Sequence, residues 1–176
     1  MKGKSKDRLK SHKDLEELRI RSDLHPKLEE NGICLPATMH TLSKLEKQTF
    51  CKRLFDLKFP YGYDSNIGKC ISVEECKITG LKSHDYHILM QQLLSIAIRG
   101  LLPKGPQIVI FQLSTFFNEL FQRVIDGTKF EEMENDFTEI LCMFEMYFLP
   151  SFFDIMVHLT IHLGREVQQC GPVQYR

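Results

Sequence analysis

Apolar residues gather in the second half of the chain, where they recur at three- and four-residue intervals in four successive segments. This spacing is typical of amphipathic helices. The segments occupy about residues 83–100, 106–125, 128–148 and 151–171, and each is followed by a glycine or proline stop signal. We therefore predict a mainly α protein, in which four helices joined by short turns pack as an antiparallel helical bundle.

Residues at the start of these segments support the boundaries. Ser83 and Ser151 stand where a hydroxyl can cap the first and fourth helices, and Thr128 with Glu131 has the pattern of a capping box before the third. Pro106 suits the first turn of the second helix. That second segment carries apolar residues on almost every side, which predicts a buried helix.

The first 80 residues are more polar and are interrupted by turn signals, so that only two helices fit. One covers about residues 5–20 and has a thin apolar stripe that needs a partner to be stable. The other covers about residues 44–57, begins at a capping box of Ser43 and Glu46, and has one apolar face, formed by Phe50, Cys51, Leu54 and Phe55. Residues 65–80 form a loop or a short strand pair.

These patterns divide the chain into a polar connecting segment, 1–80, and an all-helical domain, 81–176. The composition agrees with one modest domain, since the 176 residues are 43% hydrophobic and 26% charged. The formal net charge is +0, which gives no long-range attraction to a phosphate backbone. Nucleic acid is therefore expected to bind only indirectly, or through a basic amino-terminal arm that contains Lys2, Lys4, Lys6, Arg8, Lys10 and Lys13.

For this arm we favour a solvated terminus over a nuclear-localisation or phosphate-contacting role. No apolar run is long enough to span a bilayer, because Pro150, Asp154, His158 and His162 divide the most apolar region. We therefore expect no membrane association. Six irregularly spaced cysteines without a CxxC pattern are read as reduced, intracellular thiols, and Cys70 and Cys76 as structural residues.

Histidines and acids provide the candidate metal ligands. His158, His162 and Glu166 are four residues apart, which places them on one broad face of the fourth helix. His84, Asp85 and His87 lie at the start of the first helix and complete a shared site if the two helices cross. The acid of the HExxH protease pattern is missing. We therefore favour the alternative in which His158 and His162 form hydrogen bonds in or beside an apolar core, while His84 and Asp85 serve as helix-end groups.

Long strings of the chain resemble a known family, the plant CACTA-type (En/Spm-like) transposon transposases. These strings are MKGKSKDRLKSHKDLEELRIRSDLHP, CLPATMHTLSKLEKQTFCKRL, FPYGYDSNI, GLKSHDYHILMQQLLSIAIRGLLP and PSFFDIMVHLTIHLGREVQQCGPV. They cover nearly the whole chain and are similar to the region of unknown function that follows the catalytic region in those proteins. The segment LLPKGPQIVIFQL and the ending GPVQYR depart from the family pattern, and the chain looks like a truncated fragment of a longer protein.

The resemblance implies a nuclear location and a DNA transposase as the full-length protein. Such transposases use three carboxylates to hold two metal ions. Two of these would lie upstream, and Glu145 or Glu166 are candidates for the third, although solvated or helix-pairing acids are the favoured interpretation. One carboxylate cannot hold a metal pair, so we expect the isolated chain not to be an enzyme and to need no cofactor.

Two functions follow as hypotheses. The first is a non-catalytic accessory or interaction domain that packs against a transposase catalytic domain or another subunit. It is supported by an excess of aromatic residues, which predicts an exposed apolar patch: Phe116, Phe117, Phe121, Phe144, Phe148, Phe152 and Phe153. The alternative is a metal-dependent nucleic-acid enzyme fragment that uses the histidine and glutamate cluster with a divalent metal.

Overall fold

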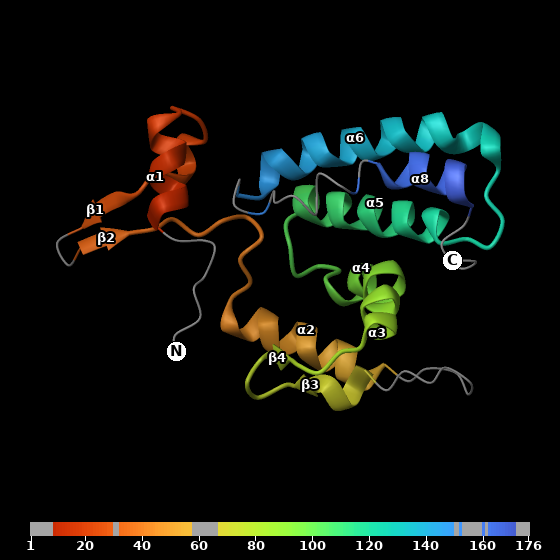
Figure 1. The fold of residues 1–176 in the computed structure, drawn as a ribbon. Coiled ribbons are helices and arrows are strands. Elements are labelled where there is room, and N and C mark those ends of the chain that lie inside the picture. Colours follow the sequence, from red (N-terminus) through yellow and green to blue (C-terminus); the bar gives the residue numbers. More distant parts are fainter. Residues whose placement is uncertain are drawn as a thin grey trace.

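Two long helices form the centre of the fold (Figure 1). The structure, a computed structural model, describes residues 9–29, 32–57, 67–149, 152, 160 and 162–171. Helices α5 (Lys104–Leu120) and α6 (Phe130–Tyr147) run antiparallel, joined by a short connection that includes the 3-10 turn η4 (Gly127–Lys129). Helix α8 (Leu163–Cys170) packs against α6. The predicted mainly α fold class is thereby confirmed, while the antiparallel four-helix bundle stays a prediction.

Aromatic and aliphatic side chains fill the space between these three helices. The rings of Phe116 and Phe137 lie 4.5 Å apart and join α5 to α6. Side chains three or four residues apart on each helix face this core, as the 3.6-residue helical period requires. The core cluster consists of Val109, Phe116, Leu120, Met133, Phe137, Ile140, Phe144, Phe148 and Val167.

The predicted first helix is present but is not regular. It consists of α3 (Ser83–Ile88), a π-helical turn, η3 (Leu89–Leu93), and α4 (Leu94–Ala97). A π-helical turn displaces backbone groups from the regular hydrogen-bond ladder. Here the Asn118 side chain of α5 donates a hydrogen bond of 2.7 Å to the carbonyl of Gln91. This bond ties the irregular turn to α5.

A second core lies between this segment and helix α2 (Lys44–Asp56). The 3-10 turn η2 (Ile67–Cys70) and the antiparallel hairpin of β3 (Ile71–Ser72) and β4 (Lys77–Ile78) complete it. Of the two alternatives for residues 65–80, the structure therefore shows the short strand pair. The cluster consists of Cys51, Leu54, Ile67, Ile71, Ile88, Leu93 and Ala97, so it contains residues from both sides of position 80. The division at residue 80 stays a prediction, but the two parts share a core.

Arg53 fixes the end of α4 from helix α2. Its Nη1 donates hydrogen bonds to the carbonyls of Ala97, at 3.0 Å, and Arg99, at 2.6 Å. The last carbonyls of a helix have no partner within the helix and carry the negative end of its dipole. A guanidinium is therefore well placed here, and it holds α2 and α4 together.

The amino-terminal part packs at the carboxyl-terminal end of α6. It contains α1 (Leu9–Glu17), the 3-10 turn η1 (Ser22–Leu24), and an antiparallel hairpin of β1 (Lys27–Glu29) and β2 (Gly32–Cys34). Leu15, Leu24 and Leu149 form a small buried cluster, which provides the partner that the apolar stripe of α1 was predicted to need. The buried His12 side chain adds a hydrogen bond of 2.7 Å between its Nδ1 and the carbonyl of Leu24.

Polar contacts strengthen this attachment. Arg21 Nη1 donates a hydrogen bond of 2.8 Å to the carbonyl of Phe148, just beyond the end of α6. The His40 ring stacks on the Phe148 ring, with 4.8 Å between the centroids, and its Nδ1 lies 3.4 Å from the carbonyl of Tyr147. Residues more than 100 positions apart are thus held together by a helix-end interaction of the same kind as that of Arg53.

Some of the predicted helix boundaries are confirmed and others are wrong. The capping box of α2 is confirmed, because the Ser43 amide donates to Glu46 Oε2 at 2.7 Å and the Glu46 amide donates to Ser43 Oγ at 3.4 Å. The predicted cap at Ser83 is wrong, since Ser83 is the first residue of α3 and the N-cap is Lys82. The predicted capping box at Thr128 is also wrong, since Asp126 accepts the hydrogen bond from the Thr128 amide.

Two further expectations concern buried faces and the fourth helix. Phe55 was placed on the apolar face of α2 but is exposed, and α5 is not buried all round, because Ile108 and Phe111 are exposed. The predicted cap at Ser151 lies outside the described residues. The stop at Gly171 is confirmed, since this residue has a φ of +79° and its amide donates to the carbonyl of Val167.

Replacing Ser43 by alanine is expected to lower the free energy of unfolding by about 1 kcal/mol, because the Glu46 amide loses the acceptor that caps α2. Urea unfolding followed by circular dichroism measures this change. Thr49→Ala is the matched control, since it removes a hydroxyl that bonds only the Leu45 carbonyl inside the same helix and leaves the capping box intact. An equal loss in both variants would contradict the assigned cap.

Candidate protein-interaction groove

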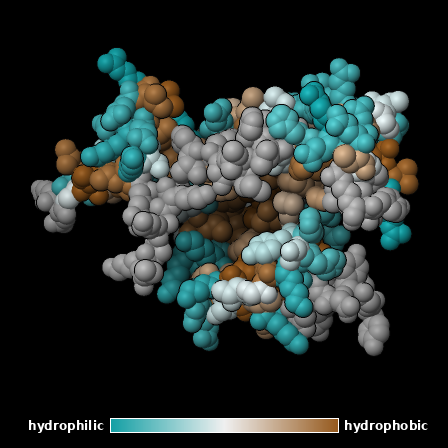
Figure 2. All heavy atoms as spheres, in the orientation of Figure 1, coloured by the Kyte–Doolittle hydropathy of each residue, from teal (hydrophilic) through white to brown (hydrophobic). Residues whose placement is uncertain are grey.

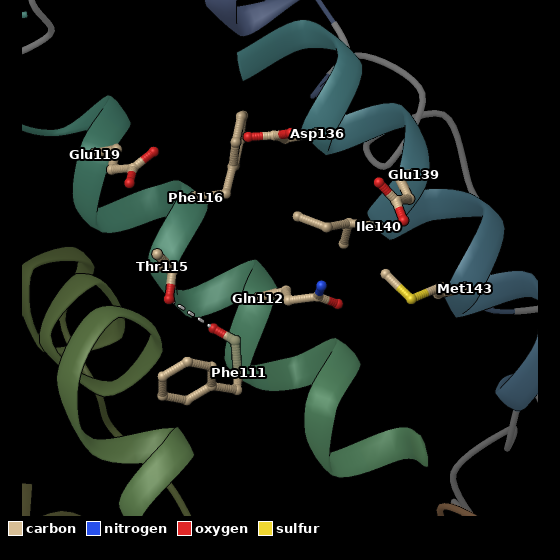
Figure 3. Close-up of a pocket in the computed structure, with 9 residues that line it drawn as sticks. All are labelled: Phe111, Gln112, Thr115, Phe116, Glu119, Asp136, Glu139, Ile140 and Met143. Carbon is tan, nitrogen blue, oxygen red and sulfur yellow. Dashed lines mark hydrogen bonds between the residues drawn. The ribbon is translucent and has the colours of Figure 1, made fainter. Parts of the chain in front are cut away.

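A groove runs along the surface between α5 and α6 and encloses about 290 Å³ (Figure 3). Helix α5 supplies one wall and α6 the other. In the close-up, Gln112 and Phe116 of α5 and Ile140 and Met143 of α6 point into the space between the two helices, whereas the Phe111 ring and Thr115 point away from α6. We call this the α5–α6 groove, and it is lined by Phe111, Gln112, Thr115, Phe116, Glu119, Asp136, Glu139, Ile140 and Met143.

The floor of the groove is apolar. Phe116 and Ile140 belong to the buried core and close the bottom, while Met143 is half-buried beside them. Phe111 lies at the edge of the groove with its ring directed away from α6, and 60% of its surface is exposed. A large aromatic side chain exposed beside a core is a feature of interaction surfaces.

The rim of the groove is acidic. Glu119 on α5 and Asp136 and Glu139 on α6 are exposed, and none of the nine lining residues is basic. Within the described part of the chain, no ion pair neutralises these three carboxylates. Helix α6 as a whole has no lysine or arginine and carries six acids, namely Glu131, Glu132, Glu134, Asp136, Glu139 and Glu145.

Gln112 introduces a polar group into this apolar floor. Its Oε1 is buried, and no donor among the described residues reaches it. In Figure 3 its amide points from α5 toward Met143. A buried acceptor without a donor costs about 1–3 kcal/mol of stability.

A second hollow adjoins the groove on the other side of Phe111. It lies between α4 and α5, encloses about 310 Å³, and is lined by Ser95, Lys104, Gln107, Ile108 and Phe111. The space-filling view shows apolar residues gathered in a hollow in the middle of this face of the molecule, with hydrophilic residues around it (Figure 2). Phe111 therefore lies between two concave surfaces and contributes to both.

The predicted aromatic patch is only partly exposed. Phe116, Phe144 and Phe148 are buried, whereas Phe117 and Phe121 are half-buried. Phe152 keeps 49% of its surface exposed, and Phe153 lies outside the described residues. The apolar pattern of residues 106–125 predicts a helix that is buried on almost every side, so it did not predict that Phe111 is exposed. The acidic composition of residues 130–147 was the one signal in the sequence that marks this part of the surface.

The predicted metal ligands do not form a cluster within the described ranges. No group of three or more histidine, cysteine, aspartate or glutamate side chains is arranged there to hold a metal ion. His84 is exposed, and His87, also exposed, makes an edge contact with Phe121 at 4.8 Å between the ring centroids. His162 and Glu166 are exposed at the start of α8, and His158 lies outside the described residues.

Other candidate residues have local structural roles. The Asp85 carboxylate accepts a hydrogen bond of 2.8 Å from the Lys82 amide, which agrees with its predicted helix-end role. Glu145, a candidate catalytic acid, is exposed on α6. The thiols of Cys70 and Cys76 contact backbone carbonyls of Gly80 and Val73, as expected of structural cysteines.

Among the described residues, no helix combines the length and the apolar character needed to cross a bilayer.

The family comparison matches residues 120–176 to a family described as "Domain of unknown function (DUF4218)". This match includes α6 and α8 but begins at the last residue of α5. No curated protein matches the chain significantly, and no solved structure does so either.

Proposed function

We propose that the chain is a non-catalytic helical interaction module and that the α5–α6 groove with Phe111 is its binding surface. The observation that carries this proposal is the exposure of Phe111 beside a concave surface with an apolar floor. Aromatic anchors that insert into a partner contribute a large share of binding free energy in protein interfaces. The groove is formed by two long helices that share one core, so it is held in a fixed geometry.

The partner follows from the resemblance to plant CACTA-type transposases. We propose that the module packs against the catalytic region of such a transposase or against another subunit of the same assembly. In this role the chain supplies a surface and no reacting group. Within the described residues, nothing favours the metal-dependent alternative over this proposal.

Co-expression with the catalytic region of a plant CACTA-type transposase tests this function. We expect the two proteins to elute together in gel filtration, and Phe111→Ala to weaken the complex by about tenfold or more because it removes the aromatic anchor. Phe55→Ala is the matched control, since Phe55 is similarly exposed but lies on α2 and does not line the groove.

Two results would contradict the proposal. Separate elution of the unaltered proteins would remove the proposed partner. Equal weakening by Phe111→Ala and Phe55→Ala would remove the groove as the binding surface. Helical circular dichroism of each variant shows whether the fold is retained, because both substitutions remove exposed side chains and are expected to leave it intact.

A further inference from the structure

The charge of the α5–α6 groove indicates what kind of partner it accepts. We infer that the groove binds a basic, amphipathic helix of a partner protein, an inference that rests on the proposed function and specifies it. The apolar floor favours contact with the apolar face of a helix, and the acidic walls favour basic side chains on both sides of that face. This is the recognition mode in which one amphipathic helix lies in a hydrophobic groove.

The acids lie on both walls, so they favour basic residues on both flanks of the bound helix. Glu119 projects from α5, and Asp136 and Glu139 project from α6. Asp136 and Glu139 are three residues apart and therefore lie on the same face of α6. Lysine or arginine side chains along two edges of a helix match this arrangement, while the same three carboxylates repel a nucleic-acid phosphate backbone.

The length of the walls suits about two turns of a bound helix. At 1.5 Å per residue, the lining residues from Phe111 to Glu119 span roughly 12 Å of α5, and those from Asp136 to Met143 span roughly 10 Å of α6. A third helix that packs across two antiparallel helices buries a stripe of side chains at i, i+3, i+4 and i+7. Met143 on α6 gives this stripe an adaptable contact, and the exposed Phe111 ring adds an aromatic contact at the edge of the groove.

Gln112 supplies the second observation that favours a basic partner. Its buried Oε1 accepts no hydrogen bond from the described residues. A lysine ammonium or an arginine guanidinium carries only donors, so a basic side chain pairs with this oxygen when the Gln112 amide turns toward the bound helix. An acidic side chain in the same position would leave it without a donor.

The test uses the full chain and three fluorescein-labelled peptides of 18 residues, with blocked ends. All have leucine at i, i+4, i+7 and i+11, and their flanking positions are lysine in the first peptide, glutamine in the second and glutamate in the third. Fluorescence anisotropy at physiological salt measures the affinities. We expect the lysine peptide to bind about tenfold more tightly than the glutamine peptide, and the glutamate peptide more weakly than both.

Paired variants assign this preference to the groove. The double variant Asp136→Asn/Glu139→Gln is expected to lower the affinity for the lysine peptide by about tenfold, to the level of the glutamine peptide. Glu131→Gln/Glu132→Gln is the control, because it removes the same charge from the same helix but outside the groove, and it is expected to change the affinity less than twofold. Gln112→Leu is expected to weaken binding of the lysine peptide several-fold while keeping the helical circular dichroism.

Several outcomes would overturn the inference. Equal weakening by the two double variants would mean a general attraction to α6. Equal affinity for all three peptides, with each weakened by Phe111→Ala, would remove the basic partner but leave the proposed interaction surface. Tighter binding of duplex DNA than of the lysine peptide would identify a different class of ligand. Absence of binding by every peptide, together with co-elution that Phe111→Ala does not weaken, would remove both the inference and the assignment of the surface.

Discussion

Replacing Phe137 by alanine is expected to lower the free energy of unfolding by about 3–5 kcal/mol. Only 2% of Phe137 is exposed, and its ring packs 4.5 Å from that of Phe116 across the α5–α6 interface. Removing the ring withdraws apolar contacts and leaves a cavity between two helices that also position the groove. Urea unfolding followed by circular dichroism measures the loss.

Phe111→Ala is the matched control, because it removes the same side chain from an exposed position on the partner helix. Its expected cost is below about 1 kcal/mol, since little buried area is lost. A similar cost for both substitutions would show that Phe137 is not part of the main core. The pair also separates stability from binding, because Phe111→Ala is the variant that is expected to weaken the partner complex.

Local signals in the sequence predicted the elements well. The capping box of Ser43 and Glu46 and the stop at Gly171 depend on residues within four positions of each other, so the spacing of a few residue types was enough. Such signals work because a helix end must satisfy its own orphan backbone groups. Where several polar residues precede a helix, as Asp126 and Thr128 precede α6, the pattern does not show which of them caps a turn; here Asp126 caps the 3-10 turn η4.

The faces of the helices were predicted less well. Helix α5 has apolar residues around most of its circumference, which indicates burial, yet Phe111 and Ile108 are exposed. The positions of α4 and α6 relative to α5 decide which of its side chains are covered, and no spacing rule contains that information. The groove could therefore not be predicted, because its walls come from two helices and its acidic rim becomes visible only when they pack.

The contacts of the amino-terminal part could not be predicted from the sequence either. Arg21 and His40 bind the end of α6 across more than 100 residues. The thin stripe of α1 predicted a need for a partner but did not identify Leu149. The π-helical turn in the predicted first helix is a comparable case, because the Asn118 side chain that binds its carbonyl comes from the next helix.

Leu15→Ala is expected to release the amino-terminal part from α6, at a cost of about 2–3 kcal/mol, without unfolding the α5–α6 core. Leu15 is fully buried, but among the residues that the structure describes its cluster contains only Leu24 and Leu149 in addition. Because the cluster is so small, removing the Leu15 side chain leaves few apolar contacts between the amino-terminal part and α6. The hydrogen bonds of Arg21 and His40 are only partly buried and each contributes about 0.5–1.5 kcal/mol, which is too little to hold the segment alone.

Hydrogen exchange resolves this local effect, because amides in α1 and α5 report separately on the two regions. In Leu15→Ala, the α1 amides are expected to lose most of their protection while those of α5 keep theirs. Leu18→Ala is the control, since Leu18 lies just beyond the end of α1 and is 66% exposed, and it should leave both regions protected. Equal loss of protection in α1 and α5 would instead mean that the three-leucine cluster and the main core unfold as one cooperative unit, in which case attachment of the amino-terminal part also stabilises the walls of the groove.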